Sequence, residues 1–177
     1  LMFSVLFQGQ GSQFVGMSME IYKKYDIVKE LFNTVDTTLG YSLSKLILEG
    51  PSDQLNLTEN TQPAIMVVGV AIFKVLEKKY NNKMNSAKFF AGHSLGEYTA
   101  LVCANSLKIE TGAYLLHERG KAMQKAAPVG SGAMMAILGM SYNDVLEEIK
   151  KIDNEGICEV ANDNCPGQIV ISGDKKK

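Results

Sequence analysis

The sequence has almost no excess of either charge, few cysteines and no long apolar run, and each shortage excludes a class of protein. With 18 basic and 19 acidic side chains the net charge is −1, and no basic patch is interleaved with aromatics, so we expect no nucleic-acid partner. The cysteines Cys103, Cys158 and Cys165 lack C-x-x-C spacing, which argues against a disulfide framework or a zinc site and fits a reducing cytosol. The longest apolar run, residues 64–73, is too short to span a bilayer, and no signal peptide is recognisable. We therefore expect a cytoplasmic protein without a membrane segment.

The stretch Gly-His-Ser-Leu-Gly at residues 92–96 is the most informative part of the chain. Residues 87–91 before it are typical of a short buried strand, and residues 97–104 after it are typical of a helix. A strand, a tight turn and a helix form a nucleophile elbow, which presents the Ser94 hydroxyl and aims the helix N-terminus at developing negative charge. That arrangement suits acyl transfer through a serine ester. The alternative is a plain tight turn.

Apolar periodicity and turn residues predict alternating strands and helices. The expected strands are residues 3–7, 87–91, 133–138, 158–161 and 168–172; the expected helices are residues 26–39, 61–80, 97–104, 110–125 and 142–151. Residues 49–53 are expected to form a turn and residues 81–86 a polar loop. This alternation predicts an α/β fold with a parallel sheet. A Pro/Gly-rich stretch predicts a boundary between a large subdomain, 1–127, and a small one, 128–177, with the partial order β-α-β-β.

The loop Gly-Gln-Gly-Ser-Gln at residues 9–13 follows the first expected strand. Phe14 stands where a dinucleotide fingerprint needs Gly, and Met17 stands where a phosphate-binding P-loop needs Lys, so neither nucleotide motif fits. The loop is then either a simple turn or, if the two strands are neighbours, a source of a second oxyanion donor such as Gln10.

Five stretches in one order resemble a known family. They are Gly-Gln-Gly-Ser-Gln at 9–13, Thr-Gln-Pro-Ala at 61–64, Gly-His-Ser-Leu-Gly-Glu-Tyr at 92–98, Arg-Gly-Lys-Ala-Met-Gln at 119–124, and Asn-Cys-Pro-Gly-Gln at 164–168. Together they resemble the malonyl-CoA:acyl carrier protein transacylases of fatty acid synthesis and the related acyltransferase domains of polyketide synthases. The resemblance implies an α/β-hydrolase-like large subdomain and the start of a ferredoxin-like small subdomain.

The resemblance also implies roles for individual residues. Ser94 resembles the nucleophile, and Gln10 and the Leu95 N–H resemble the oxyanion donors. Arg119 resembles the residue that holds the free malonyl carboxylate, which a planar guanidinium can pair bidentately; the alternative is a solvated helix charge.

Four further residues resemble positions that line or brace the site. Of these, Gln62, Asn164 and Gln168 are carried over from the resemblance, and their amides are equally compatible with buried caps and turns. The fourth is His93, which stands next to Ser94 inside the elbow, so we expect it to brace the turn. Gln8 stands where the family usually has Pro.

A serine nucleophile needs a base, and the sequence contains only His93 and His117. We expect His117 to be solvated or half-buried. The resemblance implies a base from beyond residue 177, so we expect the chain to be truncated.

The first hypothesis is transfer of malonyl from malonyl-CoA to an acyl carrier protein through a malonyl-Ser94 intermediate, by a monomer without metal or other cofactor. The alternatives are the acyltransferase domain of a polyketide synthase, a serine thioesterase or esterase, and an inactive fragment lacking its catalytic His.

Overall fold

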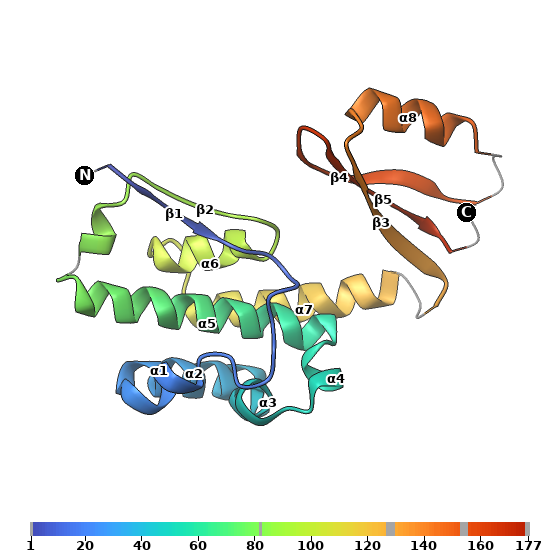
Figure 1. The fold of residues 1–177 in the computed structure, drawn as a ribbon. Coiled ribbons are helices and arrows are strands. Elements are labelled where there is room, and N and C mark those ends of the chain that lie inside the picture. Colours follow the sequence, from blue (N-terminus) through green and yellow to red (C-terminus); the bar gives the residue numbers. More distant parts are fainter. Residues whose placement is uncertain (1, 82, 127–129, 153–155, 176–177) are drawn as a thin grey trace. The chain divides into compact units, whose positions relative to one another are not determined.

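The computed structural model describes residues 2–81, 83–126, 130–152 and 156–175, which form two compact units (Figure 1). The first unit comprises Leu1–Met123 and the second Gln124–Lys177. The boundary that the sequence predicts between residues 127 and 128 lies outside the described residues.

A pair of parallel strands forms the sheet of the first unit. Strand β1 (Ser4–Phe7) pairs with β2 (Phe89–Gly92), with Phe7 opposite Gly92, so both strands end at the same edge. The two strands were predicted from the sequence, and their pairing confirms that the loop after β1 and the turn after β2 are neighbours. The loops at this edge are therefore placed to build one site.

Helices pack against one face of this sheet and supply most of the core. They are α1 (Met19–Lys24), α2 (Asp26–Leu39), α3 (Leu43–Glu49), α4 (Ser52–Leu55), α5 (Thr58–Lys79), the 3-10 helix η1 (Lys83–Ser86), α6 (Gly96–Cys103) and α7 (Ile109–Ala126). Helix α6 contacts both strands and α5, while α2 and α3 contact α5 (Figure 1). The long helix α5 thus lies at the centre of the unit, and every residue from Asn60 to Val67 on it is buried.

The sheet is buried on one face only, which corrects the expectation of a buried second strand. Val5, Phe7 and Phe90 pack against the core, whereas Leu6 and Phe89 are 75% and 70% exposed. Side chains alternate between the faces of a strand, and helices α5 and α6 contact one face. Within the described residues, the other face has no comparable cover.

Several helix boundaries differ from the sequence-based predictions. Helix α2 has the predicted bounds, and Gly40 ends it in a left-handed conformation with φ 76°. Helices α1 and α3 were not predicted, the turn expected at 49–53 runs into α4, and the polar loop expected at 81–86 contains η1. Helix α5 begins at Thr58 rather than at Thr61, so Pro63 lies in its second turn and not at its first position.

The second unit is an antiparallel sheet with one helix. It contains β3 (Gly132–Leu138), α8 (Tyr142–Lys150), β4 (Cys158–Cys165) and β5 (Gln168–Asp174), in the sheet order β3-β5-β4. All four elements were predicted from the sequence, although β4 is twice as long as expected because it runs on to Cys165. Strand β5 pairs with both β3 and β4 and so lies between them, and both pairs are antiparallel.

No helix in the four described ranges combines the length and hydropathy that crossing a bilayer requires.

Candidate functional site

Ser94 occupies a strained turn between β2 and α6. Its φ is 54°, in the left-handed region that residues other than Gly and Asn seldom adopt. The turn is closed by hydrogen bonds from the Gly96 N–H to the His93 carbonyl (2.9 Å) and from the Glu97 N–H to the Ser94 carbonyl (3.1 Å). Ser94 is exposed while Leu95 beside it is fully buried. The predicted strand–turn–helix context of the hydroxyl is therefore confirmed.

The glycines on either side of Ser94 are required by close backbone contacts. A Cβ at Gly92 would lie 1.9 Å from the Gly96 carbonyl carbon, and a Cβ at Gly96 would lie 2.4 Å from the Phe7 carbonyl oxygen. Both neighbours are backbone atoms, which cannot turn away. The second contact also places the start of α6 directly against the end of β1.

Arg119 on α7 brings the site together. Its Nη2 donates a hydrogen bond to the Ser94 hydroxyl oxygen at 3.0 Å, and its Nη1 donates to the Gln62 amide oxygen at 2.6 Å. The side chain is half-buried rather than solvated, and its partners are a hydroxyl and an amide. The hydrogen bond between Arg119 and Ser94 joins residues that are 25 positions apart in the sequence.

Gln62 is held between Arg119 and Met123 on α7. The Gln62 side chain is 1% exposed, and its Nε2 donates to the Met123 Sδ at 3.2 Å. A thioether sulfur can only accept, so the amide nitrogen faces Met123 and the amide oxygen faces Arg119. Sequence reasoning assigned no role to Met123, although it lies four residues after Arg119 and so on the same face of the helix. That spacing was the available signal.

The two predicted oxyanion donors lie at the same edge of the sheet. The Leu95 N–H is at the N-terminal end of α6, where the helix dipole is positive. Gln10 lies in the exposed turn after β1, and within the described residues its side chain makes no hydrogen bond. The neighbouring Gly9 lies against the elbow, because a Cβ there would be 2.8 Å from the His93 Nδ1. The Gly-rich loop and the elbow are thus in contact.

The two histidines lie in different surroundings. His93 is exposed and lies beside Gly9. The sequence predicts that His117 is either solvated or half-buried, and it is half-buried. Its Nδ1 lies 3.0 Å from the Glu59 carbonyl oxygen. The Ser94 hydroxyl is hydrogen-bonded by Arg119, and among the described contacts no histidine nitrogen bonds to it.

Asn164 and Gln168 belong to the second unit. Asn164 lies near the end of β4, and Gln168 is the first residue of β5. Both are exposed within the described chain. Their assignment to the site stays a prediction.

The buried thiol of Cys103 does not compete with Ser94 as a nucleophile. Burial raises the pKa of the Cys103 thiol to about 12, so this thiol stays protonated near neutral pH. In the part of the chain that the structure describes, no group of three or more His, Cys, Asp or Glu side chains is arranged to bind a metal ion. An apolar cavity of about 380 Å³ lies along β1 and α5, but Ser94, Gln62 and Arg119 do not line it.

Comparison with known proteins gives a consistent result. The family described as "Acyl transferase domain" matches residues 5–177. The chain is 45% identical over 172 residues to the malonyl CoA-acyl carrier protein transacylase of Bacillus subtilis (strain 168), covering 97% of this chain and 53% of that protein. It is 40% identical over 174 residues to the protein of the same name from Escherichia coli (strain K12), covering 98% and 55%. The chain thus spans about half the length of these relatives.

Solved structures show the same likeness. An acyl-carrier-protein-S-malonyltransferase from Bartonella henselae superposes with a TM-score of 0.89 at 42% identity, covering 98% of this chain and 56% of that one. A malonyl-transacylase in complex with a type II PKS acyl-carrier protein superposes with a TM-score of 0.90 at 39% identity, covering 99% and 56%. The family model matches nearly all residues of the chain, which has a mixed α/β fold with a parallel sheet and a serine elbow contacted by an arginine. This chain therefore belongs to the acyl transferase family.

Proposed function

We propose that the protein transfers a malonyl group from malonyl-CoA to the phosphopantetheine thiol of an acyl carrier protein in fatty acid synthesis, through an ester on Ser94. The observation that carries the proposal is the Arg119 guanidinium, 3.0 Å from the Ser94 hydroxyl and itself held by Gln62. A positive, planar group at this distance from the nucleophile suits an acyl group that ends in a carboxylate. The names of the relatives support the same substrate.

The reaction has two steps, acylation of Ser94 and transfer of the acyl group to the carrier thiol. The Ser94 Oγ attacks the thioester carbonyl, forming a C–O bond, and collapse of the oxyanion breaks the C–S bond so that coenzyme A leaves as its thiol with the serine proton. The carrier's thiol then attacks the malonyl-Ser94 ester, forming a C–S bond, and the C–O bond breaks as the thiol proton passes to the Ser94 Oγ and restores the hydroxyl. His117 is not assigned the role of moving these protons, because its described contact is to the Glu59 carbonyl, whereas the Ser94 hydroxyl is contacted by Arg119. A base within hydrogen-bond reach of Ser94 completes the site.

The oxyanion of each step is stabilised by two donors. The Leu95 N–H lies directly after the nucleophile at the N-terminus of α6, where a backbone donor of this kind belongs. Gln10 is the second donor, supported by the contact between its loop and the elbow at Gly9 and His93.

Arg119 selects the acyl group. Its guanidinium has five N–H donors, and the two observed contacts leave others for a carboxylate. When malonyl occupies Ser94, we infer that the contact to the hydroxyl is exchanged for a bidentate pair with the malonyl carboxylate. A neutral acyl group leaves the half-buried guanidinium without that pair, which disfavours it.

The remaining assignments rest on the family resemblance. His93 braces the elbow against the Gly9 loop, and Gln62, Asn164 and Gln168 line or brace the substrate site. The large part, 1–127, adopts an α/β-hydrolase-like fold; the small part, 128–177, is the start of a ferredoxin-like unit, for which the order β3-β5-β4 is support. We further propose a cytoplasmic monomer that needs no cofactor beyond the thioester substrate.

A second candidate is acyl transfer in polyketide synthesis. The observation in its favour is the solved relative that binds a type II PKS acyl-carrier protein. Both candidates use the same residues and differ only in the carrier.

One experiment separates these activities from esterase activity and from an inactive protein. The natural protein that contains this chain is incubated with malonyl-CoA or acetyl-CoA, and the acylated peptide is identified by mass spectrometry. We expect malonyl on the peptide containing Ser94, none in Ser94→Ala, and release only when a carrier thiol is added. In Arg119→Ala the malonyl-over-acetyl ratio of kcat/KM should fall by about 10- to 150-fold, the equivalent of ~1.5–3 kcal/mol for hydrogen bonds to a charged group.

Lys121→Ala is the matched control, because Lys121 lies on the same helix and is exposed. Rapid release into water would indicate an esterase, and malonyl labelling of Ser94→Ala would show that the nucleophile is another residue. An unchanged malonyl-over-acetyl ratio in Arg119→Ala would show that Arg119 has only a structural role.

A further inference from the structure

Helix α5 lacks one of its backbone hydrogen bonds near the site. In an α-helix the carbonyl of each residue accepts the N–H of the residue four positions later. For Glu59, in the first turn of α5, that residue is Pro63, which has no N–H and whose ring pushes the carbonyl away from the helix axis. The Glu59 carbonyl therefore lacks its usual partner four residues later and is open to a donor from outside the helix.

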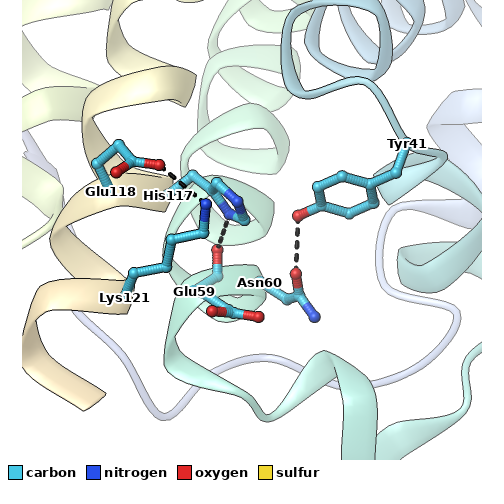
Figure 2. Close-up of polar contacts among 6 residues, drawn as sticks. All are labelled: Tyr41, Glu59, Asn60, His117, Glu118 and Lys121. Atoms are coloured by element: carbon cyan, nitrogen blue, oxygen red, sulfur yellow. Dashed lines mark hydrogen bonds and ion pairs between the residues drawn. The ribbon is translucent and has the colours of Figure 1, made fainter. Parts of the chain in front are cut away.

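His117 on α7 provides this donor. Its Nδ1 lies 3.0 Å from the Glu59 carbonyl oxygen, and Figure 2 shows the ring directed at that carbonyl from the neighbouring helix. A carbonyl oxygen can only accept, so Nδ1 carries the proton in this contact. The imidazole N–H thus stands where the backbone N–H of residue 63 is missing.

The ring of His117 is held from its other side. The Tyr41 ring lies 5.6 Å from it, centroid to centroid, and the Tyr41 hydroxyl donates to the Asn60 Oδ1 at 2.7 Å (Figure 2). The Asn60 amide in turn donates to the Gln54 carbonyl at 2.9 Å. Burial, with smaller contributions from Glu59 and Asp36, raises the pKa of Tyr41 to about 12, so the phenol stays a donor. These contacts fix both the ring and the first turn of α5.

The same turn carries Gln62 to Arg119. Helix α7 passes so close to it that a Cβ at Gly120 would lie 2.4 Å from the Glu59 Cα. Gln62 lies three residues after Glu59, within the same helical turn, and its amide oxygen accepts from the Arg119 guanidinium at 2.6 Å. A shift of this turn away from α7 would therefore move Gln62 away from Arg119.

We propose that His117 is a positioning residue, which replaces the hydrogen bond that Pro63 removes and so holds Gln62 against Arg119. The proposal rests on the function proposed above for Ser94 and Arg119. It gives His117 a role in the choice of acyl group without contact to the substrate.

The test is a double-variant cycle between residues 117 and 63 in the natural protein. His117→Phe keeps a ring but removes the donor, and the malonyl-over-acetyl ratio of kcat/KM should fall by about two- to tenfold, the range for one lost hydrogen bond. Pro63→Ala restores a backbone N–H to the Glu59 carbonyl. In that background His117→Phe should change the ratio by less than about twofold, because the carbonyl no longer depends on the imidazole. His117→Asn, which keeps an N–H near the place of Nδ1, should recover part of the ratio.

Glu118→Gln is the control on the same helix, since it alters only the exposed pair with Lys121 (Figure 2). A purely structural role would lower the rates with both thioesters equally, and that result would overturn the proposal. Equal losses from His117→Phe with and without Pro63→Ala would also overturn it. Thermal unfolding of the unsubstituted protein, His117→Phe, Pro63→Ala and the double variant measures the coupling between residues 117 and 63 without substrate. The hydrogen bond can therefore be judged even if Ser94→Ala refutes the proposed function.

Discussion

The two units differ in what lies behind their sheets. In the first unit, β1 and β2 rest on a continuous core that includes the fully buried Phe32, Leu43 and Phe73. In the described part of the second unit, Val145 and Ile169 are the buried apolar side chains, while β3 exposes side chains such as Met134 (65%) and Leu138 (69%). The first unit therefore holds its backbone by packing, and the second holds its backbone more by strand pairing and helix capping.

This difference matters for the candidate site. A residue such as Ser94, held in the left-handed region, costs on the order of 1–3 kcal/mol and persists only where the surrounding structure over-determines it. The buried Leu95 and Gln62, each at most 1% exposed, provide that surrounding structure in the first unit. The proposed nucleophile is thus built on the better-packed unit.

The largest expected effect comes from breaking that packing at the elbow. Gly92→Ala would place a Cβ 1.9 Å from the backbone of Gly96, so we expect a loss of more than about 4 kcal/mol in the free energy of unfolding of the first unit. Hydrogen exchange followed by mass spectrometry, resolved on each unit, measures the effect. Protection in the second unit should change little.

Gly40→Ala is the matched control in the same unit. Gly40 has a positive φ of 76° but open space around its Cβ position, so it should cost only ~1–2 kcal/mol for the left-handed conformation. Equal losses from the two substitutions would show that the elbow is not the tightly packed turn described above.

An intermediate effect is expected at a position of the first unit that carries little packing. Gln10 is exposed, so Gln10→Ala should leave the stability of both units unchanged. If its amide is an oxyanion donor, acyl transfer should fall by about 100- to 1000-fold, or ~2.7–4 kcal/mol of transition-state stabilisation. Steady-state kinetics with malonyl-CoA and a carrier thiol measure it. A change below about threefold would make the loop only a turn.

Local sequence signals predicted much of the fold but little of the site geometry. The four-residue recurrence of apolar side chains and Gly40 gave α2 its bounds, and the two glycines around Ser94 marked the elbow. Helices α1 and α3 were missed because six- and seven-residue helices span too few turns to show a period. The start of α5 was misplaced because Pro63 resembles a first-turn residue, whereas its missing N–H is compensated from α7.

The arrangement around Arg119 could not be read from the sequence. Its contacts to Gln62 and Ser94 join residues 57 and 25 positions away, and they depend on how α5 and α7 cross at Gly120. The resemblance implies that Arg119 is a carboxylate ligand, but only tertiary packing shows that Gln62 orients it and that Met123 in turn contacts Gln62.

The smallest expected effect is confined to the second unit and tests whether capping holds it. The Ser141 side chain accepts from the Asp144 N–H and the Asp144 side chain accepts from the Ser141 N–H, which forms a capping box at the start of α8. Ser141→Ala should lower the stability of the second unit by ~1 kcal/mol, the typical cost of losing such a cap. Ser42→Ala is the control, because Ser42 precedes α3 in the first unit without any side-chain cap bond and should change stability by less than ~0.5 kcal/mol. Hydrogen exchange in α8 measures the difference. If Ser141→Ala left α8 protected, the small buried core at Val145 and Ile169 would suffice to hold the helix, and the contrast between the two units would be one of size and not of kind.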